Sequence, residues 1–203
     1  MNNKIRIYYL GDLPSVISNL QKLNVEVSFS LSNDCNGVIA TDIIPEAELG
    51  YWKSMCFSYG IPLIVKGNKL NHYIGVNVLV LDETEKEIFY KKHNITTLQE
   101  CKDRLRELRI HYLVIALTRE QIKQEIERTL PSLGTAKLSI TNKQVSDARD
   151  ILTALVGYIY IKEGTLSAEA LMKANTKAIF SVVGFTGEDL KDFYLDINFG
   201  GNK

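Results

Sequence analysis

The sequence has 203 residues, of which 45% are hydrophobic, and its 24 basic and 24 acidic side chains give a formal net charge of zero. A chain of this length and apolar content can bury a substantial core in one domain. Zero net charge gives no bulk attraction to nucleic acid or to an anionic membrane surface, so we expect neither as a partner.

The first half of the sequence alternates short apolar runs with segments of helical pattern. Pro14 suits a first helical turn and Gly60 suits a helix end. In chain order we predict a strand at 4–10, a helix at 15–23, strands at 25–30 and 37–41, a helix at 45–59, strands at 61–65 and 76–81, and a helix at 83–92. We expect Trp52 and Phe57 to pack the helix at 45–59 onto the sheet.

The second half continues the alternation and then becomes helical. We predict a helix that is opened by Thr96 or Thr97 and ends near 109, a strand at 112–117, a charged helix or long turn at 120–130, helices at 147–162 and 167–183, and a short helix at 186–194. A short β-rich run at 138–140 precedes the long helix. We expect Ser146 or Asp147 to cap that helix, because Ser and Asp accept hydrogen bonds from free N–H groups at a helix start.

Strands that alternate with helices at this spacing predict an α/β fold, a three-layer α-β-α arrangement with a mainly parallel sheet, in a single domain over residues 1–203. The sequence shows no signal-peptide pattern and no apolar segment long enough to span a bilayer. The three cysteines are odd in number and widely spaced, which fits a reducing compartment. We therefore expect a cytoplasmic protein without a membrane partner.

Residues 144–150, with the sequence QVSDARD, resemble the D-T-x-G-A-G-D loop of the ribokinase (PfkB-type) carbohydrate kinases. In that family the loop opens a long buried helix. The resemblance implies an anion hole at Asp147, Ala148 and Arg149, and it implies that Asp150 is the general base that takes the proton from a sugar hydroxyl. The alanine and the last aspartate are kept, whereas Asp147 and Arg149 replace two glycines.

Two further segments are similar to motifs of the same family. Asp82 and Glu85 lie where an N-x-x-E motif helps to organise Mg²⁺ and phosphate, so the resemblance implies a metal site there. Thr118 and Gln121 occupy the glycine positions of a V-T-x-G-x-x-G motif that lies beneath the nucleotide. The resemblance covers residues 37–195 and implies a ribokinase-like fold. Residues 1–36 form an atypical strand-helix-strand segment where the family has sugar-contacting strands and a lid.

Side chains at the glycine positions favour a non-catalytic relative of these kinases. A Cβ atom blocks positive φ angles and close approach of the backbone to phosphate, and Asp147 adds a negative charge where phosphate would lie. We therefore interpret the chain as a pseudokinase that acts as a binding or oligomerising module and needs no cofactor. Without lid strands, apolar surface or a sheet edge should remain uncovered, so we expect a homodimer or a complex with another protein.

Two alternatives remain open at this point. Retention of Asp150 and Glu85 fits a small Mg-dependent ATP phosphotransferase that acts on a sugar-like or other hydroxyl substrate, with Asp150 as the base. The matches can also be accidental in an unrelated α/β domain. A capped helix start explains the polar residues at 146–150, and helix-start acidity explains the acidic residues at 82–87.

Overall fold

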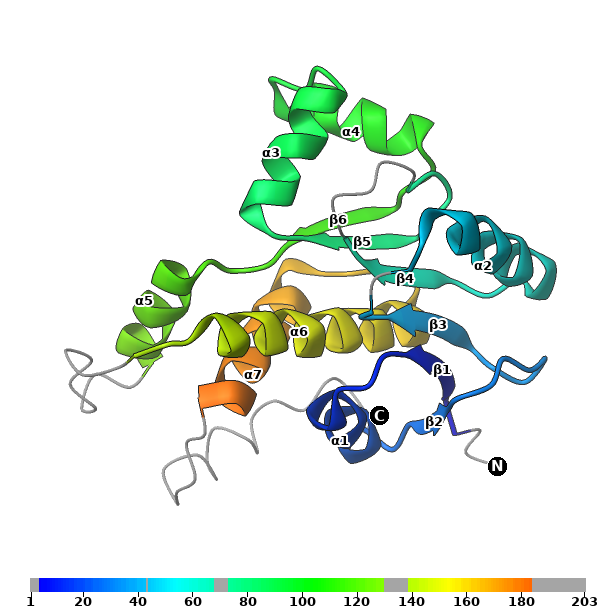
Figure 1. The fold of residues 1–203 in the computed structure, drawn as a ribbon, viewed down its shortest axis with the longest axis horizontal. Coiled ribbons are helices and arrows are strands. Elements are labelled where there is room, and N and C mark those ends of the chain that lie inside the picture. Colours follow the sequence, from blue (N-terminus) through cyan, green and yellow to red (C-terminus); the bar gives the residue numbers. More distant parts are fainter. Residues whose placement is uncertain (1–3, 43, 68–72, 130–138, 184–203) are drawn as a thin grey trace.

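The computed structural model describes residues 4–42, 44–67, 73–129 and 139–183 (Figure 1). These residues build one six-stranded sheet in the order β2-β1-β3-β4-β5-β6, and every adjacent pair of strands is parallel. The strands are β1 (Arg6–Leu10), β2 (Glu26–Ser28), β3 (Gly37–Ala40), β4 (Leu63–Lys66), β5 (Val78–Leu81) and β6 (Tyr112–Ile115). The predicted α/β class and parallel sheet are confirmed.

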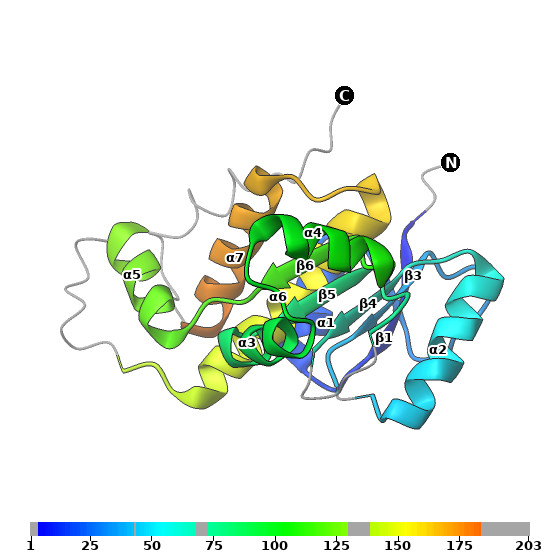
Figure 2. The same ribbon diagram turned by 90° about the horizontal axis from the view of Figure 1, so that it is seen from above.

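Helices cover both faces of the sheet, which gives three layers (Figure 2). One face carries α2 (Glu46–Tyr59), α3 (Glu83–Lys92) and α4 (Leu98–Glu107). The other carries α1 (Pro14–Lys22), α6 (Asn142–Glu163) and α7 (Ala168–Val183), and α5 (Arg119–Thr129) packs beside α7. Successive strand residues point to opposite layers, so Ile7 and Ile39 face α6 whereas Tyr8 and Val38 face α2. Burial of both faces explains why the strands are apolar throughout.

The central helix of the α1 side is α6, whose residues from Ile151 to Tyr160 are all buried. It packs on β3, β4 and β5 as well as on α1 and α7. Gly157 makes this contact close, because a Cβ built there would lie 2.7 Å from Ile39 Cδ1 and 3.3 Å from Ile64 Cγ2. Gly50 in α2 differs, since a Cβ built there would meet no atom within 4 Å.

Most predicted elements are present within a few residues of their expected bounds, but three expectations fail. The long helix begins at Asn142 and not at 147. Ser139 and Ile140 belong to no strand, while residue 138 lies outside the described residues, as does the helix expected at 186–194. Phe57 is 87% exposed and does not pack on the sheet. Trp52 does so, because its ring lies 5.2 Å from that of Tyr8 between centroids.

The two helical glycines predict stability changes of opposite sign. Gly157→Ala should lower the free energy of unfolding by about 1–3 kcal/mol, because the added methyl group overfills the contact between α6 and the sheet. Gly50→Ala should raise it by about 0.5–1 kcal/mol, because only helix propensity changes there. Urea unfolding at low micromolar protein concentration measures both values. Changes of the same sign in the two variants would contradict this account.

Candidate functional site

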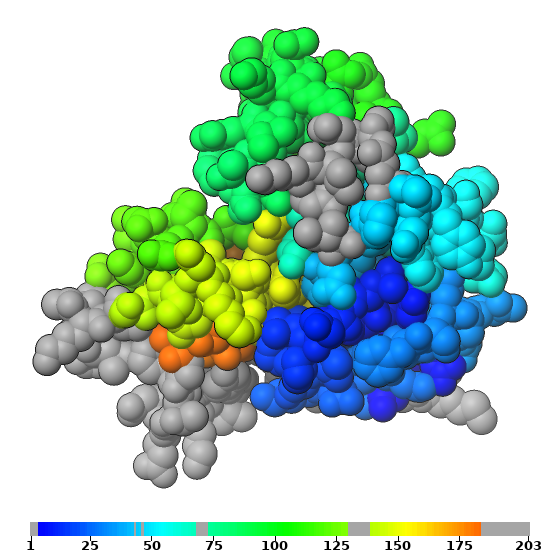
Figure 3. Space-filling view, viewed as in Figure 1, coloured from blue at the N-terminus to red at the C-terminus, as the bar shows by residue number. Residues whose placement is uncertain are grey.

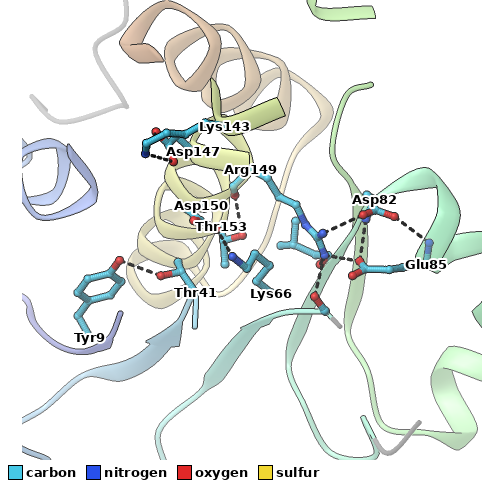
Figure 4. A network of polar contacts seen from close by, with 12 residues as sticks. Tyr9, Thr41, Lys66, Asp82, Glu85, Lys143, Asp147, Arg149, Asp150 and Thr153 are labelled. Atoms are coloured by element: carbon cyan, nitrogen blue, oxygen red, sulfur yellow. Dashed lines mark hydrogen bonds and ion pairs between the residues drawn. The ribbon is translucent and has the colours of Figure 1, made fainter. Parts of the chain in front are cut away.

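The carboxyl ends of the strands form the place where a ligand is expected in this topology. The chain runs from β1 to β2 on one side of β1 and returns to β3 on the other, so the strand order reverses between β1 and β3. Open parallel sheets bind ligands in the crevice outside the carboxyl ends of the strands at such a point. Most of the residues that we singled out from the sequence lie along this edge or on the segment of α6 that crosses it (Figure 4).

The start of α6 differs from the loop that the resemblance implies. Thr141 is the N-cap, since its hydroxyl accepts from the N–H of Gln144 while the Gln144 side chain accepts from the N–H of Thr141. The expected cap at Ser146 or Asp147 is therefore wrong. The N–H groups of residues 147–150 lie inside the helix and donate to carbonyls four residues back. They are not free to form the implied anion hole.

Arg149 occupies the centre of a network at the ends of β4 and β5. Its guanidinium donates to Asp82 Oδ2 at 3.1 Å, to Gly67 O at 2.9 Å and to Val80 O at 3.0 Å, and it pairs with Glu85. The side chains of Arg149 and Glu85 are 12% and 11% exposed. The guanidinium of Arg149 thus pairs with both carboxylates, Asp82 and Glu85, that were expected to organise a metal ion.

Asp82 and Glu85 also begin helix α3. The Asp82 carboxylate accepts from the N–H of Glu85 at 2.8 Å, and the Glu85 carboxylate accepts from the N–H of Asp82 at 3.0 Å. This reciprocal capping box satisfies two N–H groups at the helix start. The pair therefore has two structural tasks, to cap α3 and to neutralise Arg149. Nowhere in the described ranges do three or more His, Cys, Asp or Glu side chains gather in a way that could hold a metal ion.

Asp150, the candidate base, forms an ion pair with Lys66 at the end of β4. Lys66 Nζ lies 2.5 Å from Asp150 Oδ1, and the two side chains are only 16% and 13% exposed. Burial raises the pKa of the Asp150 carboxyl above its usual range, although Lys66 and Arg149 act in the opposite direction. Loss of hydration therefore outweighs the attraction of the two cations, as is common for charges inside a protein.

A second polar pair lies nearer the reversal point. The Tyr9 hydroxyl and Thr41 Oγ1, both buried, are 2.8 Å apart. Burial raises the pKa of Tyr9 to about 12, the bond to Thr41 lowers it, and the charge of Asp150 adds a smaller upward effect. Gly11 fits above this pair only because it lacks a Cβ, which would lie 2.3 Å from Thr41 Oγ1. The Tyr9 hydroxyl thus stays protonated at physiological pH, and either of the two oxygens can be the donor in this bond.

The remaining candidate residues have local contacts. Thr118 and Gln121 bond to each other at the start of α5, where Gln121 N donates to Thr118 Oγ1 at 3.3 Å and Thr118 N donates to Gln121 Oε1 at 2.8 Å. Asp147 pairs with Lys143 one turn earlier on α6. Ala148 is buried in a small apolar cluster with Ile122. The bonds between Thr118 and Gln121 and the ion pair of Asp147 thus each lie within one helix end, whereas Ala148 packs against α5.

Three residues of this edge were not singled out from the sequence as site residues: Tyr9, Thr41 and Lys66. A usable signal was present, because Tyr9 is the last residue but one of β1, Thr41 directly follows β3 and Lys66 ends β4. The carboxyl ends of parallel strands meet at one edge of the sheet. The capping box at Thr141 also had a signal, the sequence TNKQ, which places a glutamine three residues after a threonine.

No family model, curated protein or solved structure matches this chain. Within the described ranges, none of the helices has the combination of length and apolar character that crossing a bilayer requires.

The Lys66–Asp150 pair predicts a stability defect that depends on pH. Lys66→Met leaves a mostly buried carboxylate without its partner, which should lower the free energy of unfolding by about 3 kcal/mol at pH 7. The folded-state pKa of Asp150 then rises further above its unfolded-state pKa. The variant therefore loses stability as the pH rises from the unfolded-state pKa to the folded-state pKa, and it regains that stability at acid pH. Urea unfolding from pH 4.5 to pH 8 measures this.

Lys143→Met is the matched control, because Lys143 forms a pair with Asp147 on the surface of α6 and its own side chain is 76% exposed. An exposed pair of this spacing contributes about 0.3–0.5 kcal/mol. Its loss should stay small at every pH of the series. Equal pH profiles for the two variants would contradict the buried-pair interpretation.

Proposed function

We propose that this chain is a non-catalytic, carbohydrate-kinase-like α/β module that acts by binding or by self-association. The proposed kinship to ribokinase-type kinases rests on the sequence patterns at residues 82–85, 118–121 and 144–150. One observation supports a non-catalytic role: basic side chains of the protein itself form ion pairs with the candidate catalytic carboxylates. Lys66 pairs with Asp150, and Arg149 pairs with Asp82 and Glu85.

A general base must reach the hydroxyl proton that it removes. In this arrangement the Asp150 carboxylate is directed to Lys66, and a nucleotide phosphate would meet helix-internal N–H groups that have already found acceptors. A metal ion at Asp82 and Glu85 would have to displace the guanidinium of Arg149, whose side chain is only 12% exposed. The network therefore fits a structural role better than a role in phosphoryl transfer. In the structural role it holds α6, β4, β5 and α3 together.

One observation favours the phosphotransferase as a second candidate. The raised pKa of Asp150 brings this carboxyl nearer to the pH of a working base, and it lies close to the crevice that such sheets use for ligands. In that case Lys66 would turn from Asp150 to the transferred phosphoryl group, and the pair would be an inactive resting arrangement. This candidate requires ATP and Mg²⁺ as cofactors and a hydroxyl compound as substrate.

Nucleotide binding separates the two candidates. For the non-catalytic module we expect calorimetry with ATP and Mg²⁺ to give no saturable heat at high micromolar protein concentration, because the N–H groups of residues 147–150 lie inside α6 and Arg149 already pairs with Asp82 and Glu85. We also expect no release of phosphate or ADP above the blank. Micromolar affinity for ATP, or turnover that Asp150→Asn abolishes while Asp147→Asn leaves it unchanged, would overturn the proposal.

The same pair can be tested without nucleotide. Replacing both partners, in Lys66→Met with Asp150→Leu, removes the buried charges together and should restore most of the stability that Lys66→Met loses alone, because paired removal of a buried ion pair is often close to neutral. Circular dichroism and urea unfolding measure this. A double variant as unstable as the single one would show that the two residues do not act as one structural unit.

A further inference from the structure

Helix α2 exposes an uncharged stripe on the side that faces away from the sheet. Its members recur three and four residues apart, and all of them are exposed: Ala47, Gly50, Tyr51, Ser54, Phe57 and Ser58. We call this stripe the outer α2 face. Tyr51 is 58% and Phe57 87% exposed, and α2, in cyan, lies along the margin of the molecule in Figure 3. A helix with large apolar side chains on both sides is expected to be covered on both.

Gly50 indicates that another helix comes close to this face. Glycine inside a helix is less stable than alanine, so its presence calls for a reason. At Gly157 the reason is the contact with Ile39 and Ile64, but a Cβ at Gly50 would meet no atom of its own chain within 4 Å. Small residues on an exposed helix create holes into which large side chains of a facing helix can insert.

The order of small and large residues fits a second copy of the same chain. If two α2 helices pack antiparallel with a two-fold axis at Ser54, residues equally far before and after Ser54 lie level with each other. At 100° per residue, Phe57 and Gly50 lie on one side of the outer α2 face, and Tyr51 and Ser58 lie on the other. Phe57 of each copy then inserts over Gly50 of the other, and Tyr51 inserts over Ser58.

This arrangement satisfies the condition for a two-fold interface, in which a single surface must be complementary to itself. Each ring meets a small residue of the other copy, because Phe57 and Tyr51, which lie level across the axis, are on opposite sides of the outer α2 face. An unrelated partner would not need knobs and holes of one helix to be arranged symmetrically about Ser54.

We propose that the protein forms a two-fold symmetric homodimer through the outer α2 face, with the α2 helices antiparallel and crossing at Ser54. This inference rests on the proposed function, since it names the surface through which the module associates. The four exposed rings bury roughly several hundred Å² of surface on contact. An interface of that area belongs to the weak, transient class, so we expect a dimer that exchanges with monomer.

Cysteine cross-linking tests both the surface and the register. With α2 axes about 8–10 Å apart, two cysteines introduced by Ser54→Cys have Cα atoms within about 4–6 Å of each other, which a disulfide can bridge. Ser58→Cys is the matched control, because its two copies lie about 12 Å apart along the helices. The native cysteines Cys35, Cys56 and Cys101 are buried and give little background.

Under mild oxidation we expect Ser54→Cys to form a covalent dimer on a non-reducing gel and Ser58→Cys to remain monomeric. Comparable dimer yields from both variants, or no dimer from Ser54→Cys, would overturn the proposal. Nucleotide calorimetry does not depend on this interface, so the failure of the dimer and the failure of the non-catalytic proposal are read from separate experiments.

Sedimentation equilibrium of Gly50→Leu provides a second measurement. The added side chain fills the hole for Phe57, so dimerisation should weaken by roughly tenfold or more. The same substitution favours the helix and should raise the melting temperature of the monomer. A raised melting temperature would exclude misfolding as the cause of weaker dimerisation. A wild-type chain that sediments as a monomer at high micromolar concentration, or a Gly50→Leu chain that dimerises as well as wild type, would contradict the interface.

Discussion

A guanidinium removed from water needs acceptors for its N–H groups. The carboxyl edge of this sheet supplies them to the two terminal nitrogens of Arg149, whereas its Nε is buried without a hydrogen-bond partner among the described residues. Arg149 reaches from α6 to two backbone carbonyls at the ends of β4 and β5 and to the two carboxylates that begin α3. One side chain therefore fixes the relative positions of the central helix, two strands and a helix of the opposite layer. Removal of Arg149 would leave Glu85 charged and buried, which is more costly than the loss of an exposed ion pair.

The capping box at α3 links local and tertiary structure in the same place. Asp82 and Glu85 would begin a helix in any α/β protein, because they satisfy its first N–H groups. Here the same carboxylates face a cation that is 67 residues away along the chain, as Asp82 and Arg149 show. The start of α3 and the placement of α6 are consequently coupled, and substitutions at the two ends should not have additive effects on stability.

Much of the fold could be predicted from the sequence, because the apolar strands and the helix-end residues are local signals. Gly60 ends α2 with a positive φ of 65°, and Thr97 begins α4 through Glu100, in agreement with one of the two expected caps. The start of α6 could not be found by comparison with a glycine-rich loop, because the capping box at Thr141 begins the helix at Asn142, five residues before the expected start at 147.

The candidate site was harder to predict, because its charges are paired over long distances in the sequence. Lys66 and Asp150 are 84 residues apart, and nothing near either residue indicates the other. The exposure of Phe57 was equally hard to predict from the sequence, since an aromatic residue in a helix normally indicates a core contact. Its position on the outer side of α2 follows only when Trp52 and Cys56 are known to face the sheet.

The position of α6 and α7 in the sequence has a consequence for synthesis on the ribosome. All six strands are complete by Ile115, but the helices that cover the face bearing Ile39 and Ile64 extend to Val183. At about 5–20 residues per second, translation needs roughly 3–14 seconds for the stretch between those two points. During that interval an assembled sheet would present an apolar face to the cell. Of the described helices, only α1 is available to cover part of this face before then, so we expect the sheet to reach its final packing after α6 has left the exit tunnel.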